Sequence, residues 1–125
     1  MSALLLDTHA LLWWVKDDPR LSNTARRAIL DARKVYVSVV SVYEIGLKIR
    51  RRRIAATLPE LVAAVVDDGF GWLAVELEHA AQAALLPDHH RDPWDRLLAA
   101  QSIAGDLPLV STDRIFDRFE IRRLW

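Results

Sequence analysis

The chain alternates short apolar runs with longer segments of helical spacing from one end to the other. Most of the longer segments repeat apolar residues every three or four positions, the spacing of an amphipathic helix. Strands that alternate with helices form a mainly parallel sheet with helices packed on it, so the sequence predicts an α/β fold with about four or five short strands. The predicted strands are Ala3–Leu6, Val35–Val40, Trp72–Val75, Leu107–Val110 and Ile121–Leu124.

Caps and helix breakers mark where the predicted helices begin. A serine or aspartate before a helix can accept a hydrogen bond from its first turn, and a proline fits its first position. The segment Pro87–Arg91 is the one long polar loop. The predicted helix starts are Ser22 before Thr24–Ala32, Ser41 before Tyr43–Arg50, Pro59 within Leu58–Val66, and the pair Asp92-Pro93.

Length and composition indicate an ordinary globular protein. The 125 residues are enough for one domain, residues 1–125, with a core that needs no disulfides. The chain has no cysteine, which excludes a disulfide framework, a thiolate zinc site and a cysteine nucleophile. No apolar run approaches the length of a membrane span, so we expect neither a signal peptide nor an anchor, and a cytoplasmic location fits best.

Four carboxylates stand where strands end or helices begin. Asp7 follows the first apolar run, Glu44 the second and Asp113 the fourth, while Asp95 lies in the first turn of a predicted helix. Because parallel strands gather their carboxyl ends at one edge of the sheet, these acids can meet there. Two carboxylates about 4 Å apart repel by roughly 4 kcal/mol at an effective dielectric of about 20, which a divalent cation relieves.

Each acid also has a purely structural interpretation. Asp7 could cap the following helix, and Asp113 could cap the segment Arg114–Phe119. Ser41 and Glu44 have the spacing of a capping box, in which each side chain bonds the other's backbone N–H. In the Asp92-Pro93-Trp94-Asp95 segment, Asp92 is the expected cap and Asp95 the better ligand candidate, with Arg96 as an exposed neighbour.

The basic and histidine residues leave two questions open. The net charge is zero, but Arg50–Arg53 form a run that is either a solvated helix end or a surface that holds phosphates. His9 is close enough to Asp7 in sequence to contact a substrate. No two histidines have the spacing of a helical zinc site, so we do not expect a histidine-bound metal.

Four segments together resemble the PIN-domain ribonucleases, and most closely the VapC-type toxins of toxin–antitoxin pairs. The similarity spans nearly the whole chain and places the family's four acids on Asp7, Glu44, Asp95 and Asp113. It implies a three-layer α/β sandwich with a central sheet. The segments are Leu4-Leu5-Leu6-Asp7-Thr8-His9, Ser38-Val39-Val40-Ser41-Val42-Tyr43-Glu44-Ile45, His90-Arg91-Asp92-Pro93-Trp94-Asp95-Arg96-Leu97-Leu98-Ala99-Ala100-Gln101 and Ser111-Thr112-Asp113.

The resemblance implies an endoribonuclease that depends on Mg²⁺ or Mn²⁺ and hydrolyses RNA with metal-activated water. All four acids would act as metal ligands and catalytic residues. Carboxylate oxygens are the ligands that such hard cations prefer. The resemblance also implies a homodimer and a cognate antitoxin protein, with DNA contacted only through the antitoxin.

Other functional classes fit less well. The four glycines form no phosphate-binding loop. A receiver domain would need an acidic pair after the first strand, and a phosphatase of the haloacid dehalogenase kind would need an aspartate where His9 stands. The remaining alternative is a catalytically silent PIN-like module that binds a regulatory partner protein.

Overall fold

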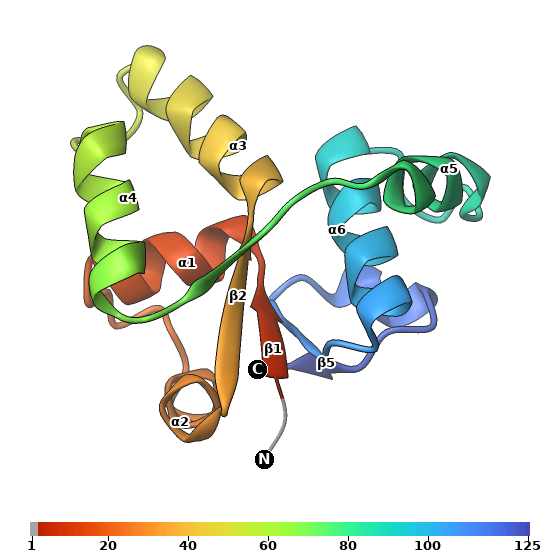
Figure 1. Cartoon of the computed structure of the whole chain (residues 1–125), viewed down its shortest axis with the longest axis horizontal. Coiled ribbons are helices and arrows are strands. Elements are labelled where there is room, and N and C mark those ends of the chain that lie inside the picture. The colour runs from red at the N-terminus through yellow and green to blue at the C-terminus, as the bar shows by residue number, and fades with distance from the viewer. Residues whose placement is uncertain (1–2) are drawn as a thin grey trace.

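Five parallel strands form a twisted sheet between two groups of helices (Figure 1). The structure is a computed structural model and describes residues 3–125. The strand order is β3-β2-β1-β4-β5, and every described pair is parallel, which confirms the predicted α/β class. The strands are β1 (Ala3–Leu6), β2 (Lys34–Ser38), β3 (Gly71–Leu73), β4 (Leu109–Val110) and β5 (Arg123–Leu124).

The helices cover both faces of the sheet and complete three layers. In Figure 1, α1 to α4 lie on one side of the sheet, and α5 and α6 lie on the other with the C-terminal turns. The helices are α1 (Thr8–Val15), α2 (Asn23–Asp31), α3 (Val39–Arg50), α4 (Leu58–Asp67), α5 (Leu77–Leu85) and α6 (Pro93–Gly105), followed by the 3₁₀ turn η1 (Arg114–Arg118). No helix among residues 3–125 has both the length and the apolar character needed to cross a membrane.

Two hydrophobic cores result from the alternation of side chains along the strands. Leu4 and Leu6 of β1 pack with α1 to α4, whereas Leu5 between them packs with α6 and the C-terminal turns. All three leucines are buried. A strand that is apolar on both faces must lie inside the sheet, and β1 occupies the central position between β2 and β4.

The predicted boundary between β2 and α3 is wrong, by two residues at the end of the strand and by four at the start of the helix. Strand β2 ends at Ser38, and α3 begins at Val39 rather than at Tyr43. Ser38 is the cap, because its hydroxyl accepts a hydrogen bond from the backbone N–H of Val40 at 3.1 Å. Valine favours strands in general, but the capping hydrogen bond and the packing of Val40 on the second core override that preference here.

Three further strands are shorter than predicted, because the chain leaves the ladder for other hydrogen bonds. The N–H of Leu107 donates to Ser102 and closes α6, and the N–H of Ile121 donates to Phe119. At the end of β3, the carbonyl of Ala74 accepts from the Gln101 side chain. The apolar runs therefore extend beyond the residues that pair as strands.

The predicted caps at Ser22 and Asp92 are confirmed. Ser22 Oγ accepts from the N–H of Ala25 at 3.0 Å, and Asp92 Oδ1 accepts from the N–H of Asp95 at 3.0 Å. Pro59 and Pro93 lie in the first turns of α4 and α6, as predicted. Asp95, whose N–H binds the Asp92 cap, lies in the first turn of α6.

Candidate active site and neighbouring surfaces

The four predicted acids lie on elements that meet at the carboxyl-terminal edge of the sheet. Asp7 directly follows β1, and Glu44 lies on α3, which follows β2. Asp95 lies in the first turn of α6, and Asp113 comes shortly after β4. The charges of Asp95 and Glu44 raise the pKa of Asp7, and the charge of Asp113 raises that of Asp95, so the acids are close enough to influence one another.

Asp7 is the buried centre of the group. Its side chain caps α1, with Oδ1 accepting from the N–H of Ala10 at 2.8 Å, so the predicted capping role is confirmed. Burial raises the pKa of Asp7 to about 6, against the lowering effect of hydrogen bonds from Ser111 and Ala10. The negative charges of Asp95 and Glu44 raise this pKa further. A charged Asp7 is therefore costly in the absence of a cation.

Glu44 is held by a hydroxyl pair and not by the predicted capping box. Thr8 Oγ1 donates to Glu44 Oε1 at 2.7 Å, and Ser41 Oγ lies 3.0 Å from Thr8 Oγ1. Since the only hydroxyl proton of Thr8 goes to Glu44, Ser41 must donate to Thr8. Ser41 lies inside α3 and cannot cap it, because the helix begins at Val39. Burial raises the pKa of Glu44, and the charge of Asp95 raises it further.

Asp95 pairs with a histidine that the sequence did not identify. His90 Nε2 lies 2.6 Å from Asp95 Oδ2. Burial raises the pKa of Asp95, the hydrogen bond from His90 lowers it, and the charges of Asp92 and Asp113 raise it. Asp95 is thus a half-buried carboxylate with one strong partner and acidic neighbours.

Asp113 completes the outer side of the group. It is exposed and caps η1, with Oδ1 accepting from the N–H of Ile115 at 3.0 Å, as predicted for the structural role. One ligand atom from each of His90, Asp95 and Asp113 lies within 4.8 Å of the other two. That spacing fits a single metal ion shared by the three side chains.

Arg96 is not an exposed neighbour, as the sequence had indicated, but the anchor of the loop that carries His90. Only 13% of its side chain is exposed. Its five N–H groups make five hydrogen bonds of 2.6 to 3.1 Å, to the carbonyl oxygens of Ala83, Leu86, Pro87 and His90. The planar guanidinium thereby fixes the connection between α5 and α6.

A signal for Arg96 was present in the sequence. A cation in the first turn of a helix is disfavoured by the helix dipole, so an arginine directly after Asp95 needs a compensating role. No comparable signal points to Thr8, because its partners Ser41 and Glu44 are 33 and 36 residues away in sequence.

The donor set fits a hard divalent cation. It consists of carboxylate oxygens with one adjacent imidazole, and burial or mutual repulsion raises the pKa of three of the acids. Burial and repulsion make the charged carboxylates unfavourable on their own, and a bound cation offsets that cost. The residues present therefore suit Mg²⁺ or Mn²⁺ better than a soft metal.

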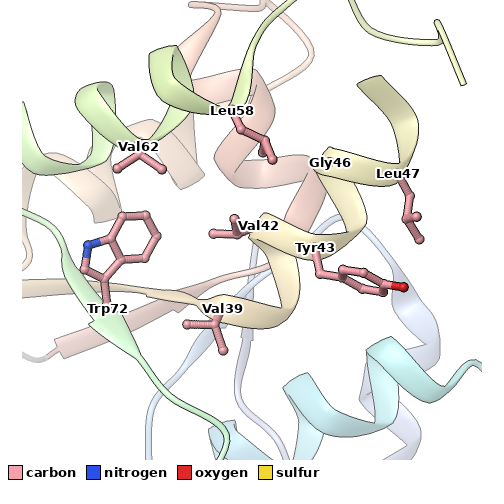
Figure 2. Close-up of a pocket in the computed structure, with 8 residues that line it drawn as sticks. All are labelled: Val39, Val42, Tyr43, Gly46, Leu47, Leu58, Val62 and Trp72. Atoms are coloured by element: carbon pink, nitrogen blue, oxygen red, sulfur yellow. The ribbon is translucent and has the colours of Figure 1, made fainter. Parts of the chain in front are cut away.

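A separate apolar groove lies between α3 and α4. Figure 2 shows Val42, Leu58, Val62 and Trp72 directed toward a common hollow. The hollow has a volume of about 600 Å³. A Cβ at Gly46 would approach Leu58 Cδ1 to 3.2 Å, so the missing side chain lets the two helices lie close. Exposed apolar surface of this kind is typical of a protein–protein contact.

Comparisons with known proteins place the chain in a family. The family model for the PIN domain matches residues 4–121. Ribonuclease VapC22 of Mycobacterium tuberculosis is 33% identical, over 91% of this chain and 89% of that protein.

Solved structures agree on the fold. VapBC2 of Rickettsia felis, bound to a promoter DNA fragment, superposes with a TM-score of 0.71 at 12% identity over 97% of this chain and 96% of that one. VapC20 of Mycobacterium tuberculosis, described as a sarcin-ricin loop cleaving toxin, gives a TM-score of 0.66 at 15% identity over 92% and 93% of the two chains. From its sequence and its fold, this chain belongs to the PIN-domain family and, within it, to the VapC ribonucleases.

Proposed function

We propose that the chain is a divalent-metal-dependent endoribonuclease and the toxin of a toxin–antitoxin pair. The observation that carries the proposal is the convergence of Asp7, Glu44 and Asp95, whose raised pKa values reflect burial and mutual repulsion. Similarity to ribonuclease VapC22 and to a toxin described as cleaving the sarcin-ricin loop supports RNA as the substrate.

In this proposal, Asp7, Glu44, Asp95 and Asp113 hold one or more Mg²⁺ or Mn²⁺ ions. A bound cation would supply Lewis-acid charge for the phosphodiester and would activate water as the nucleophile. Thr8 orients the Glu44 carboxylate, and the Ala10 N–H orients that of Asp7, so both point inward before the ion binds. No serine, cysteine or histidine nucleophile is needed.

The decisive experiment incubates purified protein with total cellular RNA and Mn²⁺, and sequences the 5′ ends of the products. We expect discrete cleavage sites for the unmodified protein, which would also identify the RNA target. Asp7→Asn keeps an oxygen for the cap on α1 and should abolish cleavage. Asp31→Asn, an exposed acid at the end of α2, is the matched control and should cleave normally. Full activity of Asp7→Asn would refute the proposed role.

Metal binding can be tested without measuring activity. Millimolar Mn²⁺ or Mg²⁺ should raise the melting temperature, because a ligand that binds only the folded state stabilises it. The combined substitution Asp95→Asn and Asp113→Asn should remove this shift. An unchanged shift in the double variant would exclude these two acids as ligands.

The proposed partner is an antitoxin protein in the cytoplasm, with the toxin itself a homodimer that reaches DNA only through the antitoxin. Several similar structures are described as VapBC or toxin–antitoxin complexes, two of them with DNA. The apolar groove between α3 and α4 offers a surface for a protein contact (Figure 2). Co-expression with any small DNA-binding protein encoded beside this chain, followed by light scattering of the purified protein, tests both associations.

The alternative is a catalytically silent module that only binds a partner protein. It predicts the same apolar groove, but it gives no reason for burying Asp7 against two further acids. Absence of metal-dependent RNA cleavage, together with stable partner binding, would favour this alternative.

A further inference from the structure

A hollow lined by basic side chains adjoins the acidic site. It has a volume of about 340 Å³ and lies where α1, α3 and the segment after α3 meet. None of the described residues that line it is acidic. Its polar lining residues are His9, Lys16, Arg20, Lys48 and Arg53.

The hollow shares two helices with the candidate active site. Lys48 lies one turn beyond Glu44 on the same face of α3, and its charge lowers the pKa of Glu44. His9 follows Asp7 by two residues on α1, and the charge of Asp113 acts on it. An extended chain bound at the acids would therefore reach this hollow.

Two of the basic side chains, those of Lys48 and Arg20, are held in place before any ligand binds. Lys48 Nζ donates to His9 Nε2 at 3.2 Å. Arg20 Cζ lies 5.1 Å from the centre of the Trp13 ring, and Asp18 holds its guanidinium at 2.7 Å. Lys48 and Arg53 form no ion pair with any described carboxylate, so their charges remain available to an anion.

The chain turns back to bring one arginine of the Arg50–Arg53 run into the hollow. Arg52 has a φ of +57°, in the left-handed region, and the N–H of Arg53 then donates to the carbonyl of Lys48 at 2.9 Å. All three of Arg50, Arg51 and Arg53 are exposed, but only Arg53 lines the hollow. The run therefore contains arginines in two structural environments.

We infer that this hollow, the basic pocket, binds a backbone phosphate of the RNA strand next to the phosphodiester held at the acids. The inference rests on the proposed ribonuclease function. Unpaired cations beside an acidic cleavage site are complementary to a polyanion. The pocket volume, at the low end of the roughly 300–1,000 Å³ typical of small-ligand sites, suits one nucleotide unit better than a protein segment.

The test measures RNA binding without cleavage. In the Asp7→Asn background, a labelled single-stranded RNA of mixed sequence is titrated at several salt concentrations and followed by fluorescence anisotropy. The pocket variant Lys48→Ala with Arg53→Ala is compared with the control Arg50→Ala with Arg51→Ala, which removes the same charge from the same part of the chain.

We expect the pocket variant to lose two phosphate contacts. The slope of log affinity against log salt should then fall by about 1.4, and affinity near 0.15 M salt by about tenfold, since each contact with a single strand contributes about 0.7 to the slope. The control should change little. Thermal melts of both variants verify that they fold.

Two outcomes would overturn the inference. Equal losses in both variants would mean that the RNA responds to the general charge of the run and not to the pocket. Unchanged RNA binding, with loss of assembly with the co-expressed antitoxin, would assign the pocket to the protein partner. If the unmodified protein fails to cleave RNA but the slope difference persists, the ribonuclease proposal fails and the phosphate pocket stands.

Discussion

The two halves of the acidic site are built differently. The inner half, Asp7 and Glu44, is attached to the sheet edge by short hydrogen bonds on α1 and α3. The outer half, Asp95 and Asp113 with His90, lies on the first turn of α6, a 3₁₀ turn and a loop. The inner half is determined by regular secondary structure, whereas the outer half depends on how one loop is fixed.

The two halves differ in what it costs, in free energy, to form them. In the inner half the cost is electrostatic, because Asp7 is desolvated and lies near two other acids. In the outer half the cost is conformational, because the loop between α5 and α6 must be ordered to bring His90 to Asp95. Substitutions that act on one cost and not on the other can test the comparison.

The largest effect on stability is expected at Arg96, whose hydrogen bonds order the loop of the outer half. Arg96→Lys keeps the charge but cannot reach four carbonyl oxygens at once. Because hydrogen bonds to charged groups contribute roughly 1.5–3 kcal/mol each, the free energy of unfolding should fall by about 3 kcal/mol or more. Urea denaturation measures this loss, and the metal-induced rise in melting temperature should disappear with it.

Arg91→Ala is the matched control, since Arg91 lies in the same loop and is exposed. It should unfold like the unmodified protein. If Arg96→Lys were equally stable, the outer half would not depend on this anchor and the two halves would be more alike than the structure indicates.

Because a charged Asp7 is costly in the inner half, Asp7→Asn should raise the free energy of unfolding by an amount that depends on pH. The pKa of Asp7 rises from its usual 3.8 to about 6 in the folded protein, so the charged form destabilises the fold. In metal-free protein the substitution should leave stability unchanged below about pH 4. The gain should grow between pH 4 and 6 and level off at about 3 kcal/mol above pH 6.

Unfolding curves at pH 4 and pH 7.5 measure this difference. Asp31→Asn, at an exposed site, should give the same curve as the unmodified protein at both values. A stabilisation of Asp7→Asn that does not vary with pH would contradict the desolvation argument. Added Mn²⁺ should narrow the gap at pH 7.5, because only the carboxylate form gains from the cation.

Substitutions at Thr8 test whether its hydroxyl orients the Glu44 carboxylate. Thr8→Val keeps the shape of the side chain but removes the donor to Glu44 and the acceptor for Ser41. We expect a loss of about 1–2 kcal/mol in stability, because two buried or half-buried polar groups lose a partner. Thr8→Ser retains the hydroxyl and should preserve both stability and metal affinity. Equal behaviour of the two variants would show that the hydroxyl does not position Glu44.

The sequence predicted the caps around the site better than its long-range contacts, for a physical reason. Asp7 follows an apolar strand and caps a helix, both of which are local patterns. The α/β class and the caps at Ser22 and Asp92 follow from the same short-range rules. Local patterns fail where a contact joins distant segments, as in the pair of Thr8 with Glu44.

The errors at element boundaries have the same origin. The capping box expected for Ser41 and Glu44 satisfies every local rule, yet Ser38 caps the helix three residues earlier. Where α3 begins depends in part on Val40, which packs in the second hydrophobic core. The sequence of the segment alone does not reveal that contact. Arg96 was predicted to be exposed because its carbonyl partners, in α5 and in the segment after it, lie 6 to 13 residues away in sequence.

His90 is the finest test of the comparison, because its two possible roles give different metal preferences. If its imidazole binds the ion with Asp95 and Asp113, His90→Ala should weaken the binding of Mn²⁺ more than the binding of Mg²⁺, since nitrogen ligands favour the transition metal. If it only orients Asp95, both ions should weaken alike, by about tenfold. Titrations followed by melting temperature separate the cases. In the second case His90→Gln, which can still donate to Asp95, should restore the affinity for Mg²⁺. If His90→Ala binds both ions as tightly as the unmodified protein does, His90 has no role in the metal site.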